Sequence, residues 1–408
     1  MQRWKMENKN KLLLTDVISS FGTGISDVAI ITMAYMITKS PEKTAYIISL
    51  RLISSMLVFF LIPHLLKILS MRELSIFTDF ARSVTCLTIA FTWNIYVLAI
   101  LSTLISLCAG LNTTLKNVAF QKFVDSEERI SFVSKQQFYY NSFGLIAPII
   151  SSLTIGIFGI KFIFYVESFL FLMSTCIVFS LEEWTPDNLS QKKSIFSGFT
   201  YIFNDKVQKN ILFFRLSIIT SMVAYEIIST YILTDNYKEL INHINIIYVS
   251  SYSTVVALFS SMSTFSLLVG SLMAGKIFKI ESINKSFISG AVLISVGCLI
   301  WSVPLTKFLV LSYLSGTFII YLGLSLLKIS LYSSGQELTD KSKFSEIIAT
   351  SDMISRSYQS LLGFVIVVGI DHFTAEKCFL FLAFAALGSL FFSSSIYKPL
   401  ILRKVKDG

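Results

Sequence analysis

The chain has 408 residues and a formal net charge of +9; 54% of its residues are hydrophobic and only 14% are charged. A water-soluble chain of this size needs far more charge to coat its surface, so the composition excludes a soluble globular protein and indicates lipid as the solvent for much of the chain. The apolar residues come in runs of about 20, the length that a helix needs to cross roughly 30 Å of hydrocarbon. No run alternates polar and apolar residues as a transmembrane β-barrel requires, so we expect an all-α integral membrane protein.

Taken in chain order, the apolar runs predict twelve transmembrane helices. They cover residues 12–38, 44–66, 74–92, 96–116, 136–158, 160–181, 209–233, 250–275, 286–304, 308–330, 350–370 and 376–397. Short polar breaks such as residues 40–43 and 93–94 mark their ends. The longest break follows the sixth helix, and its last part, residues 194–203, has the apolar periodicity of a short helix lying on the inner membrane surface.

This map predicts three parts of the chain. Residues 1–181 form an N-terminal six-helix bundle, residues 182–208 a cytoplasmic connector, and residues 209–408 a C-terminal six-helix bundle. Two bundles joined by a long connector are the expected plan for halves that rock against each other.

The two halves also resemble each other weakly. Lys9-Asn10 opens the first helix as Lys209-Asn210 opens the seventh. Gln136-Gln137 and Ser351-Asp352 follow the fourth and tenth helices at corresponding places. Matches at equivalent positions predict parallel six-helix repeats.

The distribution of basic residues predicts the topology. With the N-terminus inside, roughly 22 Lys and Arg residues fall in cytoplasmic segments and about 6 in external ones, as the positive-inside rule requires. We therefore expect both termini in the cytoplasm of a multi-pass protein of the bacterial inner membrane. The excess of positive charge is then topological, and we expect no binding of nucleic acid.

Five ionisable residues stand out inside the predicted helices: Asp16 and Asp27 in the first, Arg51 in the second, and Arg215 and Glu226 in the seventh. An ionisable group in hydrocarbon costs about 2.5–3.5 kcal/mol, so such groups usually face a cavity or a partner. Asp16 and Asp27 share one helix face about 16 Å apart along the axis, and Arg215 and Glu226 repeat this spacing. When Lys9 is aligned with Lys209, Glu226 falls one place before the counterpart of Asp27.

These acids predict proton coupling. Burial disfavours the charged form of a carboxyl and a nearby cation favours it, so access to water from either side can change its proton occupancy. We expect Asp27 and Glu226 to bind protons and substrate by turns, with Asp16 as a further candidate near the inner interface. The alternative is that Arg51 or Arg215 neutralises an acid to hold helices together. Glu167 in the sixth helix is another candidate, with packing as the alternative role.

Pro148 lies in the middle of the fifth predicted helix. A proline there removes a backbone hydrogen bond and kinks the helix. The small residues Ala147, Ser151 and Ser152 would let a partner helix approach closely. We expect this contact to seal the outer side of the cavity; a kink without a gating role is the alternative.

Cysteine and histidine give no sign of a metal or disulfide site. The five cysteines lie inside apolar runs without CxxC or Cys/His spacing, and the three histidines are scattered. No nucleophile–base set is present, so we expect neither an enzyme nor a bound cofactor.

Three segments point to a family. The first helix carries Ser-Ser-Phe-Gly-Thr-Gly-Ile-Ser-Asp at residues 19–27, the third Thr-Asp-Phe-Ala-Arg at residues 78–82, and the fifth Gly-Leu-Ile-Ala-Pro at residues 144–148. They resemble the macrolide-efflux and enterobactin-exporter-like branch of the major facilitator superfamily, and the last is similar to the motif that marks its exporters. The resemblance implies the major facilitator fold, alternating access, and gating roles for Asp79 and Arg82.

We therefore expect a secondary active transporter, a monomer, that exports an amphipathic small molecule such as a drug, siderophore or secreted metabolite in exchange for protons. An aromatic content of 14% suits an adaptable apolar site. Two alternatives stay open. The loop after the second helix keeps only Lys67 and Arg72 of the family's basic character, which favours a sensor or immunity protein that does not transport. Import by the same fold is the other.

Overall fold

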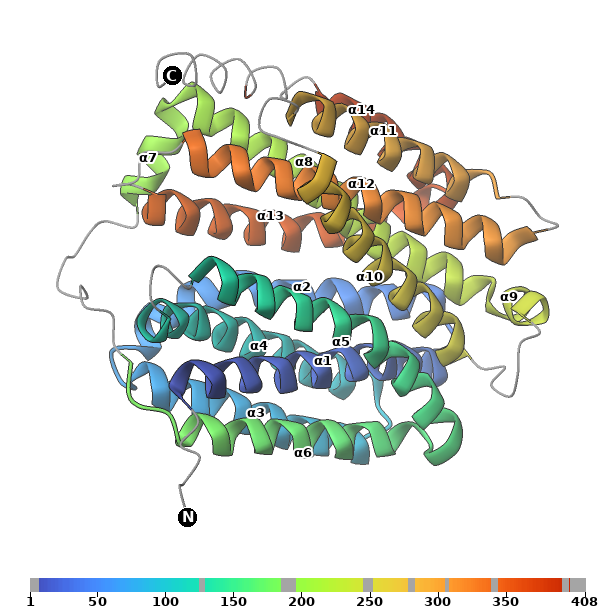
Figure 1. Ribbon diagram of the computed structural model, residues 1–408. Helices are drawn as coiled ribbons and strands as arrows, with labels where there is room; N and C mark the ends of the chain where they lie inside the picture. The colour runs from blue at the N-terminus through green and yellow to red at the C-terminus, as the bar shows by residue number, and fades with distance from the viewer. Residues whose placement is uncertain are drawn as a thin grey trace. The chain divides into compact units, whose positions relative to one another are not determined.

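The computed structural model describes residues 7–124, 129–184, 196–244, 252–277, 283–304, 308–338, 344–390 and 396 (Figure 1). The described chain is helical throughout its regular elements. In order these are α1 (Asn8–Thr38), α2 (Pro41–Leu65), α3 (Met71–Phe91), α4 (Ile95–Phe123), α5 (Arg129–Phe158), α6 (Ile160–Phe179), α7 (Phe196–Asn204), α8 (Lys206–Asp235), α9 (Tyr237–Ile244), α10 (Tyr252–Ile277), α11 (Ile283–Ser302), α12 (Leu309–Leu338), α13 (Phe344–His372) and α14 (Ala375–Gly388).

The predicted polar breaks are helix caps. The Ser40 hydroxyl accepts a hydrogen bond from the Lys43 amide at 3.3 Å and precedes a proline at the first position of α2. The Asn94 side chain caps α4 in the same way. Ser70 and Glu73 form a reciprocal capping box at the start of α3. Side-chain oxygens therefore satisfy orphan amides where the apolar runs begin, which fixes these boundaries.

Ten helices of the described chain are long and apolar enough to cross a membrane. The predicted spans 44–66 and 376–397 begin in α2 and α14, which are not among the ten, and residues 391–395 and 397 of the last span lie outside the described residues. The count of twelve and the cytoplasmic termini therefore stay predictions. The short helix α7 covers most of the predicted stretch 194–203 and extends one residue beyond it. The short helix α9, after α8, is not predicted from the sequence. Part of the predicted connector, residues 185–195, lies outside the described residues.

The chain divides into two compact units. The first unit comprises residues 1–191 together with 246–261, and the second comprises residues 192–245 together with 262–408. The helix α10 is shared between them, because its residues up to Ser261 belong to the first unit and those from Met262 belong to the second.

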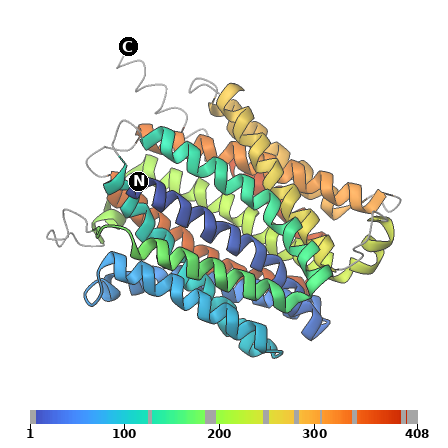
Figure 2. The ribbon, with the colours of Figure 1, turned by 60° about the horizontal axis from the view of Figure 1, so that its bottom comes forward.

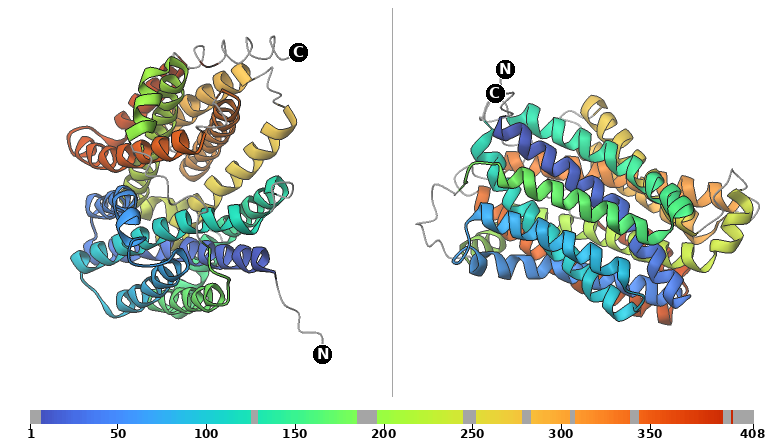
Figure 3. Two further views of the ribbon diagram at one scale, coloured as in Figure 1. Left: turned by 90° about the vertical axis from the view of Figure 1, so that its left-hand side faces the viewer. Right: turned by 90° about the horizontal axis from the view of Figure 1, so that it is seen from below.

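Each unit repeats one packing scheme. In the first unit α1 contacts α2, α4, α5 and α6, while α3 packs against α4 and α6; α1 is visible between α5 and α6 in Figure 2. In the second unit α8 contacts α12, α13 and α14, while α11 packs against α12 and α14 (Figure 3). The first, third, fourth, fifth and sixth long helices of each unit therefore make equivalent contacts, in agreement with the repeat that the sequence predicts.

The contact between α11 and α12 depends on glycine. A Cβ placed on Gly323 would lie 2.6 Å from the carbonyl oxygen of Gly290, and one placed on Gly297 would lie 2.8 Å from that of Gly316. Backbone therefore packs directly on backbone at two levels of this helix pair, as small residues allow in membrane proteins.

Candidate functional site

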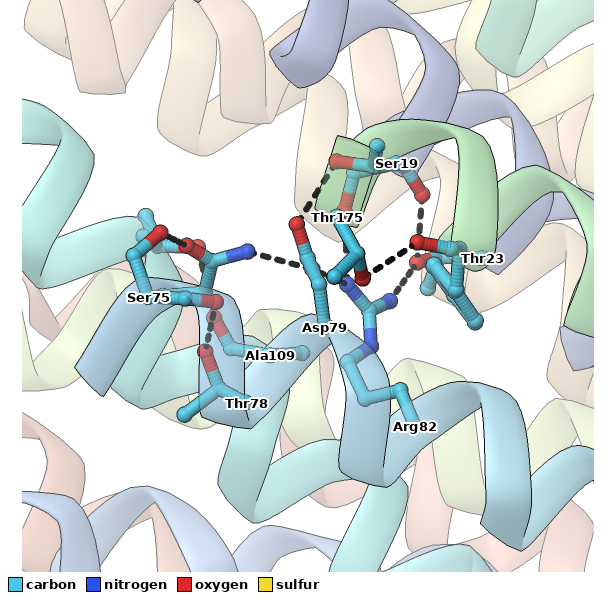
Figure 4. Close-up of polar contacts among 12 residues, drawn as sticks. Ser19, Thr23, Ser75, Thr78, Asp79, Arg82, Ala109 and Thr175 are labelled. Carbon is cyan, nitrogen blue, oxygen red and sulfur yellow. Dashed lines mark hydrogen bonds and ion pairs between the residues drawn. The ribbon is translucent and has the colours of Figure 1, made fainter. Parts of the chain in front are cut away.

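A buried polar network lies inside the first unit, around Asp79 and Arg82 of α3 (Figure 4). Asp79 is 0% exposed and Arg82 is 1% exposed, and the two side chains form an ion pair at 3.5 Å. The Asp79 carboxylate also accepts hydrogen bonds from the Asn112 amide of α4 and the Ser174 hydroxyl of α6, each at 2.6 Å. Three partners therefore compensate the cost of burying this charge.

The guanidinium of Arg82 reaches across to α1. It donates to the Ser19 and Thr23 hydroxyls, each at 2.6 Å, and lies 3.7 Å from the centroid of the Phe171 ring of α6. Figure 4 shows the guanidinium between Asp79 and these two hydroxyls. The predicted gating residues Asp79 and Arg82 thus connect α1, α3, α4 and α6 within one unit.

Asp27 forms an ion pair with Arg51 in the first unit. An Arg51 Nη atom lies 2.5 Å from a carboxylate oxygen of Asp27, and Arg51 Nε donates to the Ser106 hydroxyl of α4 at 3.0 Å. The Asp27 side chain keeps 45% of its surface exposed. The structure therefore brings together two of the predicted charges, and leaves the acid of the pair accessible from outside the unit.

Arg215 in the second unit pairs with Asp352 of α13. Next to this pair, the Thr220 hydroxyl lies 2.7 Å from the Tyr358 hydroxyl, so two polar contacts join α8 to α13. Asp352 is not among the site residues predicted from the sequence. Its position at the beginning of the predicted span 350–370 was the available signal, because an acid there needs a partner. Lys116, 2% exposed in α4, was also missed.

Asp16 accepts a hydrogen bond from the Gln136 amide of α5 at 2.8 Å. This contact joins α1 to α5, as the pair of Arg215 and Asp352 joins α8 to α13. Both contacts lie near the beginning of the first helix of their unit. A polar contact between the first and fifth long helices is therefore present in both units. In the first unit α1 supplies the acid Asp16, and in the second unit α8 supplies the base Arg215.

Glu226 lies on the exposed side of α8, whereas its neighbour Tyr225 is buried. The Tyr225 hydroxyl lies 2.7 Å from the Thr317 hydroxyl of α12, inside the second unit. Asp27 and Glu226 belong to different units. Their joint role in coupling stays a prediction.

The small residues around Pro148 make the close helix contacts that the sequence predicts. Ala147 is fully buried, and a Cβ placed on Gly24 of α1 would lie 3.0 Å from its methyl group. The Ser151 hydroxyl donates to the Ile25 carbonyl of α1 at 2.7 Å. Here α1 and α5 approach each other closely.

The same part of α5 also contacts the first half of α10. The Ser152 hydroxyl lies 3.4 Å from that of Ser253 and donates to Thr254 at 3.2 Å. The Ser261 hydroxyl donates to the Leu145 carbonyl at 2.9 Å. All three contacts lie within the first unit. They form a polar clasp, residues 145 and 152 of α5 with residues 253, 254 and 261 of α10, that joins the two helices.

Within the described residues, no group of three His, Cys, Asp or Glu side chains could hold a metal ion.

Comparison with known proteins places the fold. The sequence model of the Major Facilitator Superfamily matches residues 12–361. No curated protein matches the sequence. Among solved structures, the chain is similar to the nucleoside transporter NupG, with a TM-score of 0.73 and 13% identity over 96% of this chain and 100% of that one. It is also similar to a POT family transporter in complex with a thioalcohol conjugated peptide, with a TM-score of 0.74 and 15% identity over 95% of this chain and 96% of that one. A bacterial homologue of the iron transporter ferroportin in the inward-facing state gives a TM-score of 0.65 and 14% identity over 96% and 98% of the two chains.

Proposed function

Because the chain belongs to the Major Facilitator Superfamily, we propose that it is a secondary active transporter that exports an amphipathic small molecule in exchange for protons. Transport takes place by alternating access of two six-helix bundles, residues 1–181 and 209–408, joined by the connector 182–208. The protein is a monomer of the bacterial inner membrane with twelve spans and both termini in the cytoplasm.

The ion pair of Asp27 and Arg51 is the observation that supports proton coupling most directly. The pair lies inside predicted spans, where an ionised group needs a partner, and its acid remains half exposed. A proton that binds the Asp27 carboxylate removes the charge that holds Arg51, which keeps its contact with Ser106. Proton binding and a change of contacts between α1 and α2 are then one event. Glu226, Arg215 and Asp16 supply further charges for the same cycle.

The contacts around Pro148 support export. Residues 144–148 resemble the fifth-helix motif of exporters, and in the predicted topology they lie at the middle of the membrane, with Ser151 and Ser152 on its outer side. Small side chains let α5 pack against α1 and the first half of α10 at this level. This packing closes the outer side while the substrate binds from the cytoplasm. Through their ion pair and hydrogen bonds, Asp79 and Arg82 hold α1, α3, α4 and α6 in position relative to one another.

We expect Asp27→Asn to abolish the uncoupler-sensitive part of extrusion completely, because an amide neither binds nor releases a proton. Cells that lack their own pumps express the protein and are loaded with ethidium, erythromycin or a catecholate siderophore. Retention is measured with and without a proton uncoupler. Asp235→Asn, at the exposed end of α8, is the matched control and should extrude as the original protein does.

The same measurement separates the other functions. Extrusion that Asp27→Asn leaves unchanged removes Asp27 from the mechanism. Uncoupler-sensitive accumulation in place of extrusion identifies an importer. A folded protein that moves no compound of the panel identifies a sensor or immunity protein on the same fold.

A second prediction concerns the polar clasp between α5 and α10. Ser152→Trp should open it, because overpacking at a well-packed contact costs about 1–3 kcal/mol. Ser253→Cys in a chain without other cysteines then reports the opening through its rate of reaction with a membrane-impermeant maleimide added outside. We expect that rate to rise on the order of tenfold, which corresponds to about 1.4 kcal/mol.

Leu153→Trp is the control for this experiment. Leu153 is the next residue of α5 and is 48% exposed, so a larger side chain there does not enter the clasp. Equal labelling rates in Ser152→Trp and Leu153→Trp would show that the clasp does not gate access.

A further inference from the structure

Glu167 lies in the middle of α6 and is 0% exposed. Among the described residues neither of its carboxyl oxygens has a hydrogen-bond partner in good geometry, and only the Ser26 hydroxyl and the Cys86 thiol, a weak donor, lie close enough to interact. Asp79, buried to the same degree in the same unit, has an ion pair and two hydrogen bonds. Of these two buried acids of the first unit, Asp79 has an ion-pair partner and Glu167 has none within the described part of the chain.

Among the described residues, Arg82 is the cation that interacts with Glu167. The helix α6 contacts α1, α3 and α5. The Cys86 thiol of α3 and the Ser26 hydroxyl of α1 interact with the Glu167 carboxyl, and Arg82 of α3 and Asp27 of α1 act on it through their charges. The helix α5 carries no charged residue between 141 and 158. A proton or Arg82 is thus the available means of compensating a charge on Glu167.

Arg82 has an unused donor. Its terminal nitrogens serve Ser19, Thr23 and Asp79, whereas its Nε is buried without a partner. Phe171 holds the guanidinium over its ring, one helical turn along α6 from Glu167. Gly22 leaves room beside both side chains, because a Cβ placed on it would lie 3.6 Å from Glu167 Cγ and from the Phe171 ring. Among the described residues, an unused guanidinium donor and an acid that has no ion-pair partner therefore lie in the same cluster.

An ionised carboxylate without a partner is far more costly in a dry interior than the neutral acid. The neutral acid is therefore the form that this arrangement of Glu167 accommodates. When the proton passes to a water molecule, a carboxylate remains on Glu167. This carboxylate attracts the guanidinium of Arg82, which until then is bonded to Asp79, Ser19 and Thr23.

We propose that Glu167 is a proton-binding site of the first unit and that Arg82 moves from Asp79 toward Glu167 when the proton leaves. This rests on the proposed proton-coupled transport, and it names the buried residue that takes part in it. Because Arg82 holds two hydroxyls of α1, its displacement shifts α1 against α3 and α6. The same helix carries Asp27, so the state of Glu167 is transmitted to the exposed ion pair.

Infrared difference spectroscopy of the purified protein tests this without any substrate. Between acidic and alkaline buffer, we expect a carbonyl band of a protonated carboxylic acid to disappear and guanidinium bands, assigned by isotope-labelled arginine, to shift. Both changes should be lost in Glu167→Gln. The matched control Glu239→Gln, the same replacement at an exposed glutamate of α9 that has no part in the proposed cycle, should keep both.

Each result decides the proposal. If Glu167→Gln keeps the carbonyl band, Glu167 is not the proton-binding site, whatever the protein transports. If the band is lost but the guanidinium bands still shift, Arg82 does not respond to Glu167. Should Glu167→Gln fail to fold, Glu167→Asp keeps the acid and must move the band to a different frequency. The dye and macrolide assay is read separately, so a protein that extrudes nothing yet shows both spectral changes retains the proton site and loses the proposed function.

Discussion

Arg82→Met should leave the protein unable to keep its fold after extraction into detergent. The substitution removes the cation beside Asp79, which is 0% exposed, and leaves a charge buried with hydrogen bonds alone. Breaking a buried ion pair at one partner typically costs about 3–5 kcal/mol, a large share of the stability of a protein. It also removes the contacts with Ser19, Thr23 and the Phe171 ring. The measurement is the temperature at which the monodisperse peak is lost in size-exclusion chromatography.

The double variant Asp79→Asn with Arg82→Met is the decisive comparison. Removal of both charges leaves no unpaired ion, so the double variant should be more stable than Arg82→Met alone. Arg51→Met serves as the control at an ion pair whose acid is 45% exposed, where water or lipid headgroups replace the lost partner and the loss should be smaller. If Arg82→Met and Arg51→Met lose the monodisperse peak at the same temperature, the buried network contributes little to stability.

Gly323→Ala should separate α11 from α12 and destabilise the second unit. One added methyl group would lie 2.6 Å from the Gly290 carbonyl oxygen and 2.9 Å from an Ile294 side-chain carbon. A backbone carbonyl inside a helix cannot move aside as a flexible side chain can, so the whole helix has to shift. Overpacking of this kind costs about 1–3 kcal/mol, which outweighs the gain of about 1 kcal/mol that alanine brings to a helix interior. The same melting measurement reports the result.

Gly369→Ala is the matched control for this prediction. Gly369 lies in α13, and a Cβ placed on it meets nothing within 4 Å. The substitution should therefore leave the melting temperature unchanged or raise it slightly. If both variants melt alike, the close approach of α11 and α12 is not a condition of the fold.

Much of the fold could be predicted from the sequence, because hydrocarbon allows few choices to a long apolar run. The first predicted span, 12–38, ends where α1 ends, and the predicted breaks at residues 40–43 and 93–94 carry the caps of α2 and α4. The helix α9 was missed because its eight residues are too few and too polar to form a span. Apolar length is informative about spans and not about short helices outside them.

The candidate site could be predicted only in part. Asp27, Arg51 and Arg215 stand out in the sequence by their cost in lipid. Their partners do not, since the pairs join residues far apart in the chain, as Arg215 and Asp352 do. The burial of Asp79 and Arg82 was equally hidden, because a charge near the beginning of a helix can be either hydrated or enclosed by neighbouring helices. Only the packing of α1, α4 and α6 around α3 decides this.

The shared helix α10 has a mechanical consequence. Its residues up to Ser261 belong to the first unit and those from Met262 to the second. One continuous helix therefore contributes side chains to the packing of both units. Ser260, Ser261, Ser263 and Thr264 flank the crossing point, and hydroxyls that bond to the preceding turn bend helices at little cost. This segment is therefore the part of α10 that we expect to bend most easily.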